Sequence, residues 1–320
     1  MLYHKLGKTD INISKVCVGA MSFGQRFEDF HMWTLDRDAT DEMVKKALDL
    51  GINFFDTANT YAHGTSEEYL GKALKKYAKR EDVVIASKVY FNEGHLSRAA
   101  ILREIDGTLS RLGTDYLDLY IIHRFDYNTP IEETMRALDS LVKAGKVRAL
   151  GASAMYGYQF ANMQQCANDN NLTPFVSMQN HYNLLYREDE RELIPICKQQ
   201  GVALTPYSPL AGGHLSKPTW ESDSERSKTD KVIISKYDHA KENDMQIIAR
   251  VKELSEKYGR KMSEIALAWL VKKGVATLLV GATKPVYLED AARALELELT
   301  DEDIQYLEEP YFPHQIVGAI

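Results

Sequence analysis

The chain has 320 residues, of which 44% are hydrophobic and 27% charged, as in a folded globular protein, and this length fits either two domains or one α/β barrel. Lysine and arginine number 39 against 46 aspartate and glutamate residues, which gives a net charge of −7. A chain with this balance lacks the broad positive field that nucleic acid or an anionic membrane requires, so we expect neither as a partner.

The N-terminus and the cysteines indicate a compartment. Residues 1–8 are polar and lack the apolar segment of a signal peptide, and no apolar run approaches the roughly 18 residues of a membrane span. The three cysteines, Cys17, Cys166 and Cys197, are far apart and odd in number, which argues against a disulfide framework. We therefore expect a protein of the reducing cytoplasm.

Eight short apolar runs, each followed by a helical pattern, predict eight strands at residues 16–20, 52–55, 83–87, 116–122, 147–151, 175–179, 202–206 and 277–281. Five of the runs follow a glycine at the end of an amphipathic stretch: Gly51, Gly113, Gly145, Gly201 and Gly274. Glycine just past a helix adopts the left-handed conformation cheaply. These junctions therefore predict a helix end followed by a buried strand.

Polar residues mark the starts of several predicted helices. Ser66 and Ser97 precede amphipathic runs, and Thr129-Pro130-Ile131-Glu132 has the pattern of a capping box with proline at the first helical position. We expect helices to begin at these three places.

Eight strand-then-helix units in a row predict an α/β protein with a parallel (β/α)8 TIM barrel, because right-handed crossovers close that number of strands into a ring. The alternative is an open doubly wound sheet that binds a dinucleotide. That fold carries Gly-x-Gly-x-x-Gly after a strand, and the nearest stretch, Gly19 to Gly24, lacks the middle glycine. The barrel is the expected fold.

Three segments lie outside the barrel pattern: residues 1–15, 207–240 and 296–320. We expect a short N-terminal plug, a long binding loop after the seventh strand and a helical C-terminal tail. What remains is close to the roughly 250 residues of one barrel. We therefore expect a single domain over residues 1–320.

The residues that follow the strands carry the chemistry in such a barrel. Asp56 and Tyr61 follow the second predicted strand, Lys88 the third and His123 the fourth. Singly, each has a structural explanation, but together at three neighbouring strand ends they indicate a site.

Their combination suits the reduction of a carbonyl group. A phenol with an ordinary pKa of about 10 is a poor acid near neutral pH unless a cation lowers that pKa, and Lys88 can supply the cation. Asp56 would keep the lysine charged, and a neutral His123 could donate a hydrogen bond to the substrate oxygen.

Three stretches resemble those of the aldo-keto reductase superfamily: residues 51–58 with Tyr61, residues 86–88, and residues 116–123. The resemblance runs through nearly the whole chain, and it is nearest to the bacterial and fungal branch close to aryl-alcohol dehydrogenases and potassium-channel β-subunits. It implies an NADPH-dependent oxidoreductase that reduces aldehydes or ketones to alcohols, with Tyr61 as general acid and base, Lys88 and Asp56 tuning it, and His123 orienting the carbonyl.

The resemblance also implies a cofactor site made of Gly19, Met21, Ser153, Gln179, Tyr207, Ser208, Leu210, Gly213, Gly281, Thr283 and Lys284. Ser153 and Gln179 match groups that hold the nicotinamide amide, and Tyr207 matches the aromatic that stacks on its ring. Residues 208–215 match the loop that crosses the pyrophosphate, and residues 281–284 fall where the family binds the 2′-phosphate of NADPH.

Three positions depart from the family pattern. Ala154 stands where asparagine is common, and Tyr287 and Ala291 replace a common glutamine and asparagine in the helix after the eighth strand. These replacements remove amide contacts, so the choice between NADPH and NADH stays open at this point.

The substrate is expected to be a small carbonyl compound, in a pocket to which Phe23, Trp33, Tyr90 and Arg124 contribute from the loops after the first, third and fourth strands. Arg124, directly after His123, allows two interpretations. It either meets an anionic substrate or forms a structural salt bridge.

Two other functional classes have features that can be compared with this sequence. A metal-dependent hydrolase is disfavoured, because the nine histidines include no His-x-His or His-Glu-x-x-His pair, and we expect no metal site. A regulatory subunit that senses the nicotinamide nucleotide, with slow or vestigial turnover, remains the alternative. The oligomeric state cannot be read from these patterns.

Overall fold

Eight parallel strands form one curled sheet in the computed structural model, which describes residues 1–28, 31–221, 236–237 and 240–318. In the order in which they pair, the strands are β10 (Leu278–Val280), β3 (Val16–Gly19), β4 (Phe54–Asp56), β5 (Val84–Val89), β6 (Leu117–Ile122), β7 (Val147–Ser153), β8 (Phe175–Gln179) and β9 (Ala203–Leu204). The two edges meet where the Ala276 amide donates to the Leu204 carbonyl at 2.8 Å. The predicted (β/α)8 barrel and its eight strands are confirmed.

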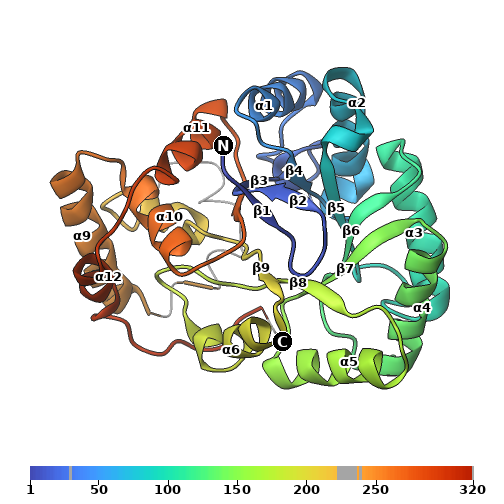
Figure 1. Ribbon diagram of the computed structural model, residues 1–320. Coiled ribbons are helices and arrows are strands. Elements are labelled where there is room, and N and C mark those ends of the chain that lie inside the picture. Colours follow the sequence, from blue (N-terminus) through green and yellow to red (C-terminus); the bar gives the residue numbers. More distant parts are fainter. Residues whose placement is uncertain (29–30, 222–235, 238–239, 319–320) are drawn as a thin grey trace.

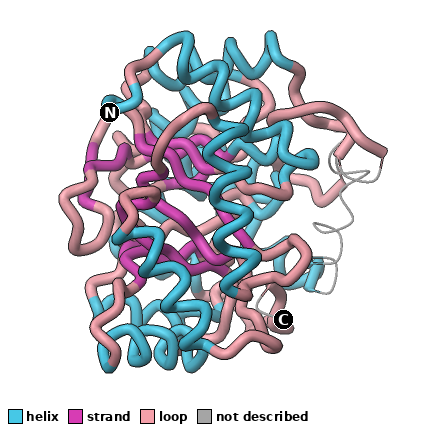
Figure 2. The backbone as a smooth tube through the Cα atoms, turned by 90° about the vertical axis from the view of Figure 1, so that its right-hand side faces the viewer, coloured by secondary structure: helices cyan, strands magenta, loops and turns pink. Residues whose placement is uncertain are grey.

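Helices surround these strands (Figure 1), and the side view shows the strands enclosed between them (Figure 2). The α-helices of the described residues are α1 (Arg37–Asp49), α2 (Thr65–Tyr77), α3 (Arg98–Leu112), α4 (Ile131–Lys143), α5 (Gly157–Asp169), α6 (Leu193–Gln200), α9 (Lys241–Tyr258), α10 (Met262–Lys272), α11 (Pro285–Ala294) and α12 (Asp301–Glu308). None of these helices is long and apolar enough to cross a membrane. The five glycines predicted to end helices all have φ between +67° and +84°.

The predicted start of α3 is confirmed, because the Ser97 hydroxyl caps its first turn. The other two predicted caps are wrong. α2 begins one residue before Ser66, whose hydroxyl donates to the Ala20 carbonyl at 2.7 Å. α4 begins after Pro130, and the Thr129 hydroxyl donates to Asp126 at 2.6 Å. In both cases the hydroxyl donates a hydrogen bond to an acceptor elsewhere and does not cap the N–H groups of the helix start.

Alternate residues of the strands fill the interior of the barrel. These inward side chains are mostly small or branched: Cys17, Phe54, Val84, Ala86, Leu119, Ile121, Ala149, Ala203 and Leu279. The residues between them pack outward against the helices in a second, larger core. Successive side chains of a strand point to opposite faces, so this alternation also decides which residues reach the mouth of the barrel.

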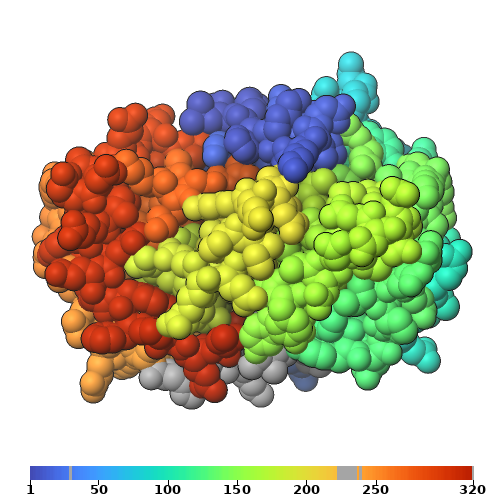
Figure 3. All heavy atoms as spheres, turned by 60° about the horizontal axis from the view of Figure 1, so that its bottom comes forward, coloured from blue at the N-terminus to red at the C-terminus, as the bar shows by residue number. Residues whose placement is uncertain are grey.

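The N-terminal residues close the opposite end. Strands β1 (Tyr3–Lys5) and β2 (Asn12–Ser14) form an antiparallel hairpin whose neighbours Leu6 and Ile11 are buried with the interior cluster. The turn at Gly7 has φ of +57°, and a Cβ there would stand 2.4 Å from the Val176 carbonyl oxygen. Figure 3 shows these blue residues against the yellow and orange parts of the chain. The hairpin is the predicted plug.

The C-terminal tail packs as a helix followed by an extended segment, in agreement with the prediction. Glu308 of α12 accepts hydrogen bonds from the Trp269 indole and from Arg187, both at 2.8 Å. Beyond it, the Tyr311 hydroxyl and the His314 amide bind Glu188 (the red segment in Figure 3). Of the loop expected at 207–240, residues 222–235 and 238–239 lie outside the described residues.

Two helical glycines provide a test of the helix packing. A Cβ on Gly71 of α2 would stand 2.2 Å from the Leu112 carbonyl oxygen at the end of α3. We expect Gly71→Ala to lower the free energy of unfolding by about 1–3 kcal/mol, although alanine favours a helix by about 1 kcal/mol. Urea denaturation measures the change.

The matched control is Gly107→Ala in α3, where the new Cβ meets only the far end of the Arg111 side chain, at 2.9 Å. We expect this variant to be as stable as the parent protein or more stable by up to about 1 kcal/mol. Equal destabilisation by the two substitutions would contradict the close approach of α2 and α3.

Candidate active site

Four candidate side chains meet at the mouth of the barrel because the alternation of the strands continues to their ends. Asp56, Lys88 and His123 each stand two residues beyond an inward side chain, namely Phe54, Ala86 and Ile121. The neighbouring strands β4, β5 and β6 therefore aim them at the same space. Tyr61 begins the short 3-10 helix Tyr61–Gly64, after the loop that follows β4.

Lys88 is the centre of the group and has no exposed surface. Its ammonium donates to Asp56, to the Thr57 carbonyl at 2.9 Å and to the Tyr61 hydroxyl at 3.4 Å. From β8, across the barrel, the Gln179 amide donates to the second oxygen of Asp56 at 2.9 Å. Burial acts to lower the pKa of Lys88, but Asp56 and Tyr61 outweigh it and hold that pKa above its ordinary value. The lysine is charged.

The hydroxyl of Tyr61 keeps its proton at neutral pH. Desolvation raises its pKa above the ordinary value, and the charge of Lys88 opposes that rise without reversing it. Lys88 does act to lower this pKa, as expected from the sequence, but burial has the larger effect and the net shift is upward. Since Lys88 donates to the phenol oxygen, the phenol proton is left for another acceptor.

His123 is neutral. It is 8% exposed, and burial together with the charges of Lys88 and Arg124 lowers its pKa well below the ordinary value. Its Nδ1 has no hydrogen-bond partner among the described residues. The ring stands edge-on to Tyr61, with centroids 5.8 Å apart, and to Phe91 at 5.0 Å. A neutral imidazole at this place can donate one hydrogen bond and accept another.

The loops at the mouth carry unusual backbone conformations. Six non-glycine residues in them have positive φ: Ala62, His63, His95, Ala154, Ser208 and Ala211. Such conformations cost about 1–3 kcal/mol each and occur mostly at functional sites. Their concentration after β4, β5, β7 and β9 marks this end of the barrel as the working end.

The candidate cofactor residues lie on the other side of the mouth. Gly19 ends β3 and Met21 follows it; Ser153 and Gln179 end β7 and β8; Tyr207, Ser208, Leu210 and Gly213 follow β9; Gly281, Thr283 and Lys284 follow β10. In the barrel these five strands are consecutive, since β9 and β10 are linked and β10 pairs with β3. They form one arc, and the strands of Asp56, Lys88 and His123 form the other.

The groups on this arc fit a phosphate-bearing dinucleotide. Tyr207 offers an aromatic ring held parallel to His181, with centroids 5.1 Å apart. Gly213 has φ of +106°, and a Cβ there would meet only Ser216, so its backbone is open to a close approach. Lys284 stands exposed at the start of α11, whose first turn has no side-chain cap. A free helix N-terminus with a cation beside it suits a phosphate group.

The candidate substrate residues divide into two kinds. Phe23 has no exposed surface and Trp33 is 6% exposed, so both are buried. Tyr90, partly exposed, stacks on His95 with centroids 4.8 Å apart. Arg124 is also partly exposed, and its guanidinium donates to the His123 carbonyl at 2.8 Å.

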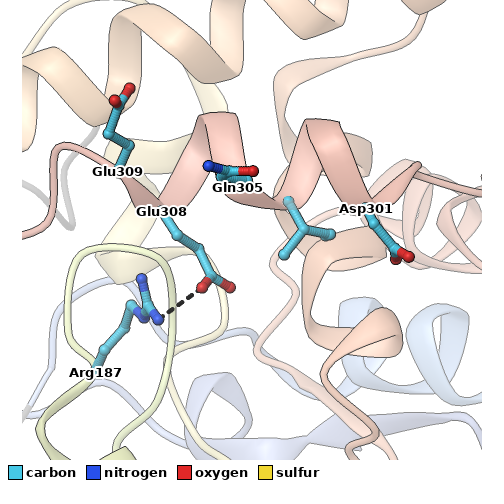
Figure 4. Close-up of a pocket in the computed structure, with 6 residues that line it drawn as sticks. Arg187, Asp301, Gln305, Glu308 and Glu309 are labelled. Atoms are coloured by element: carbon cyan, nitrogen blue, oxygen red, sulfur yellow. Dashed lines mark hydrogen bonds and ion pairs between the residues drawn. The ribbon is translucent and has the colours of Figure 1, made fainter.

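A surface hollow of about 450 Å³ lies beside α12. It is lined by Arg187, Asp301, Ile304, Gln305, Glu308 and Glu309, and Figure 4 shows Arg187 turned toward Glu308 and paired with it. The hollow contains none of the candidate residues, and its main charges already bind one another. Among the described residues no group of three or more histidine, cysteine or acidic side chains could hold a metal ion.

Sequence analysis missed a histidine that extends the same alternation. His181 comes two residues after Gln179 and is buried. Its ring stacks on Tyr186 and on Tyr207, with centroids 4.2 Å and 5.1 Å away, and its Nε2 lies 2.7 Å from the Tyr237 hydroxyl. These contacts fix the ring of Tyr207. The alternation of inward side chains, continued two residues past Gln179, is the sequence signal that could have identified His181.

The chain resembles known proteins over nearly its whole length. The model of the Aldo/keto reductase family matches residues 15–311. Versiconal hemiacetal acetate reductase of Aspergillus parasiticus is 40% identical over 341 residues, which cover 99% of this chain and 98% of the relative. A putative aryl-alcohol dehydrogenase of Schizosaccharomyces pombe is 41% identical over 352 residues, with 100% and 98% covered.

A solved structure agrees with these relatives. The crystal structure of a thermostable aldo-keto reductase in complex with the inhibitor epalrestat matches with a TM-score of 0.78 and 29% identity. The match covers 97% of this chain and 100% of the other.

The neutral state of His123 can be measured by NMR titration. We expect its imidazole to keep the shifts of the neutral ring from pH 8 down to about pH 5.5, because its folded pKa lies well below the ordinary 6.5. His123→Asn identifies the resonances. In the unfolded chain this histidine is protonated below its ordinary pKa, so it costs stability as the pH falls, and the asparagine variant should lose less stability between about pH 6.5 and 5. A midpoint near 6.5 in the folded protein would contradict the assignment.

Proposed function

The chain belongs to the aldo/keto reductase family, and on that premise we propose that it reduces aldehydes or ketones to alcohols with NADPH, with Tyr61 as the general acid. One observation carries the proposal: the buried, charged Lys88 binds both Asp56 and the hydroxyl of Tyr61. This arrangement places a proton donor beside a fixed positive charge, where a carbonyl oxygen can take up a proton.

The roles of the residues follow from their charge states. A bound nicotinamide cofactor would supply the hydride. Tyr61 gives its proton to the carbonyl oxygen, and the negative charge left on the phenol faces Lys88, 3.4 Å away. Asp56 keeps Lys88 charged and in place, while the neutral ring of His123 donates a hydrogen bond to the same carbonyl oxygen as charge develops on it. In the reverse direction Tyr61 takes the proton back.

The arc from β7 to β3 supports NADPH as the cofactor. We assign Ser153 and Gln179 to the nicotinamide amide and Tyr207 to its ring. Thr283 and Lys284 stand at the uncapped start of α11. A hydroxyl and an ammonium beside a helix N-terminus suit the 2′-phosphate that distinguishes NADPH from NADH.

The proposal includes the domain organisation and the compartment. The chain acts as one domain over residues 1–320, which the family match to residues 15–311 and the single eight-stranded sheet support. It works in the cytoplasm, which the three free cysteines support. The fission yeast relative, named as a putative aryl-alcohol dehydrogenase, favours aromatic aldehydes as first substrates to try.

Tyr61→Phe tests the general acid. We expect NADPH oxidation with 4-nitrobenzaldehyde to fall at least about 100-fold, because the proton donor is lost, while NADPH still binds. Tyr116→Phe is the control, since that tyrosine precedes β6 at the opposite end of the barrel from His123. Tight NADPH binding without turnover across a panel of aldehydes would favour a nucleotide-sensing subunit over the reductase.

Lys284→Ala tests the cofactor. Loss of an ammonium at a phosphate site should weaken NADP⁺ binding about 10-fold or more and leave NAD⁺ binding nearly unchanged. Fluorescence titration of the purified protein measures both. Lys272→Ala, on α10 and paired with Asp301, controls for a general loss of positive charge. Equal weakening of the two nucleotides by Lys284→Ala would remove the 2′-phosphate from this position.

A further inference from the structure

We propose that Arg124 binds an anionic group of the substrate, so that the preferred substrates of this site are aldehydes that also carry a carboxylate. The inference rests on the proposed reduction at the same site, and it names the substrate class.

The placement of Arg124 is the first step. It follows His123 directly at the end of β6, and its guanidinium donates to the His123 carbonyl at 2.8 Å. The guanidinium carbon also lies 5.6 Å from the centre of the Phe91 ring, which itself stands 5.0 Å from the His123 ring. The backbone of His123 and the face of Phe91 thus hold the cation beside the residue that would bind the carbonyl oxygen.

Arg124 has no acidic partner among the described residues. Arg80, Arg111 and Arg187 pair with carboxylates within 2.8 Å. Most other arginines of the described residues also form an ion pair with a carboxylate, at distances of up to 3.5 Å. No carboxylate of the described part of the chain lies within ion-pair distance of Arg124. A guanidinium has five N–H donors, and here one hydrogen bond to a carbonyl uses only part of them. The structural salt bridge considered from the sequence is absent within these residues.

Two acids, one that ends β4 and one that follows β6, are engaged elsewhere. Asp56 is held by Lys88 and Gln179. Asp126, two residues after Arg124, accepts from the Leu96 amide at 3.1 Å and from two groups of its own turn. Neither carboxylate is free to turn to the guanidinium.

The charge of Arg124 reaches the reacting groups. It contributes to the electrostatic surroundings of Tyr61, His123 and Tyr207, in each case acting to lower the pKa. Arg124 therefore adds a positive charge beside these groups, in a chain whose net charge is −7. A substrate carboxylate would neutralise the charge of Arg124. Arginine binds carboxylates through two parallel N–H groups.

A phosphate of the cofactor is the competing occupant. The groups that suit phosphates, Gly213 and Lys284, follow β9 and β10. Arg124 follows β6, on the arc of Asp56, Lys88 and His123, and the order of strands separates it from them by β7 and β8. The topology favours the substrate, and the experiment distinguishes the two.

The test compares two aldehydes of nearly the same shape, 4-carboxybenzaldehyde and its neutral methyl ester, with NADPH and the full-length protein. We expect the parent protein to prefer the carboxylate, and Arg124→Ala to lower kcat/KM about 10- to 100-fold for the carboxylate, mainly through KM, but less than about 3-fold for the ester. Arg124→Lys should keep part of the preference. Arg98→Ala, an exposed arginine at the same end of the barrel, should change neither value.

Ionic strength gives an independent measurement. Salt should lower kcat/KM for the carboxylate but not for the ester in the parent protein, and this difference should vanish in Arg124→Ala. Equal losses for both aldehydes, or a raised KM for NADPH in Arg124→Ala, would overturn the substrate role. If the parent protein reduces neither aldehyde nor any other, the proposed function fails; if it reduces both alike, only the carboxylate site fails.

Discussion

A buried ammonium group governs the mouth of this barrel. Taking a charge out of water costs several kcal/mol unless partners replace the lost hydration, so a lysine without exposed surface must be surrounded by acceptors. Asp56, the Thr57 carbonyl and the Tyr61 hydroxyl provide them. Gln179 in turn holds the free oxygen of Asp56 from the far side of the barrel. The same contacts that make the charge tolerable also fix the phenol, so the stability of the centre and its chemistry depend on one arrangement.

The barrel makes this arrangement possible through the size of its inner residues. The small side chains of Ala86, Ala149 and Ala203 leave room in the interior of the barrel. At Gly151 the packing is tighter, because a Cβ there would stand 2.6 Å from the Ser177 hydroxyl oxygen. Because the inner side chains are small and the side chains at the mouth are long and polar, residues from opposite strands of the barrel can make contact, as Gln179 and Asp56 do. The hairpin at the other end buries Leu6 and Ile11 against the apolar interior.

The order of the strands divides the work. Adjacent strands β4, β5 and β6 carry the proton-handling groups, and the consecutive strands from β7 to β3 carry the groups suited to a nucleotide. Arg124 stands on the first arc without a carboxylate partner in the described chain, whereas ten other arginines of the described residues are ion-paired. A charge without a counter-charge beside a desolvated centre costs free energy, and this cost favours Arg124 as a group that binds an anionic ligand.

The sequence by itself determined the periodic features: eight strands, the glycines that end the helices, and the strand-end positions of Asp56, Lys88 and His123. These are local, because hydrophobic period and glycine conformation depend on neighbouring residues. Only the tertiary structure decided which hydrogen-bond and ion-pair partners each polar group has. The Ser66 hydroxyl donates to a carbonyl 46 residues away instead of capping its helix, and Gln179 binds a carboxylate across the barrel. Burial raises the pKa of Tyr61 above its ordinary value. Such partners are far apart in the chain, and desolvation depends on everything packed around a group, so no local pattern encodes them.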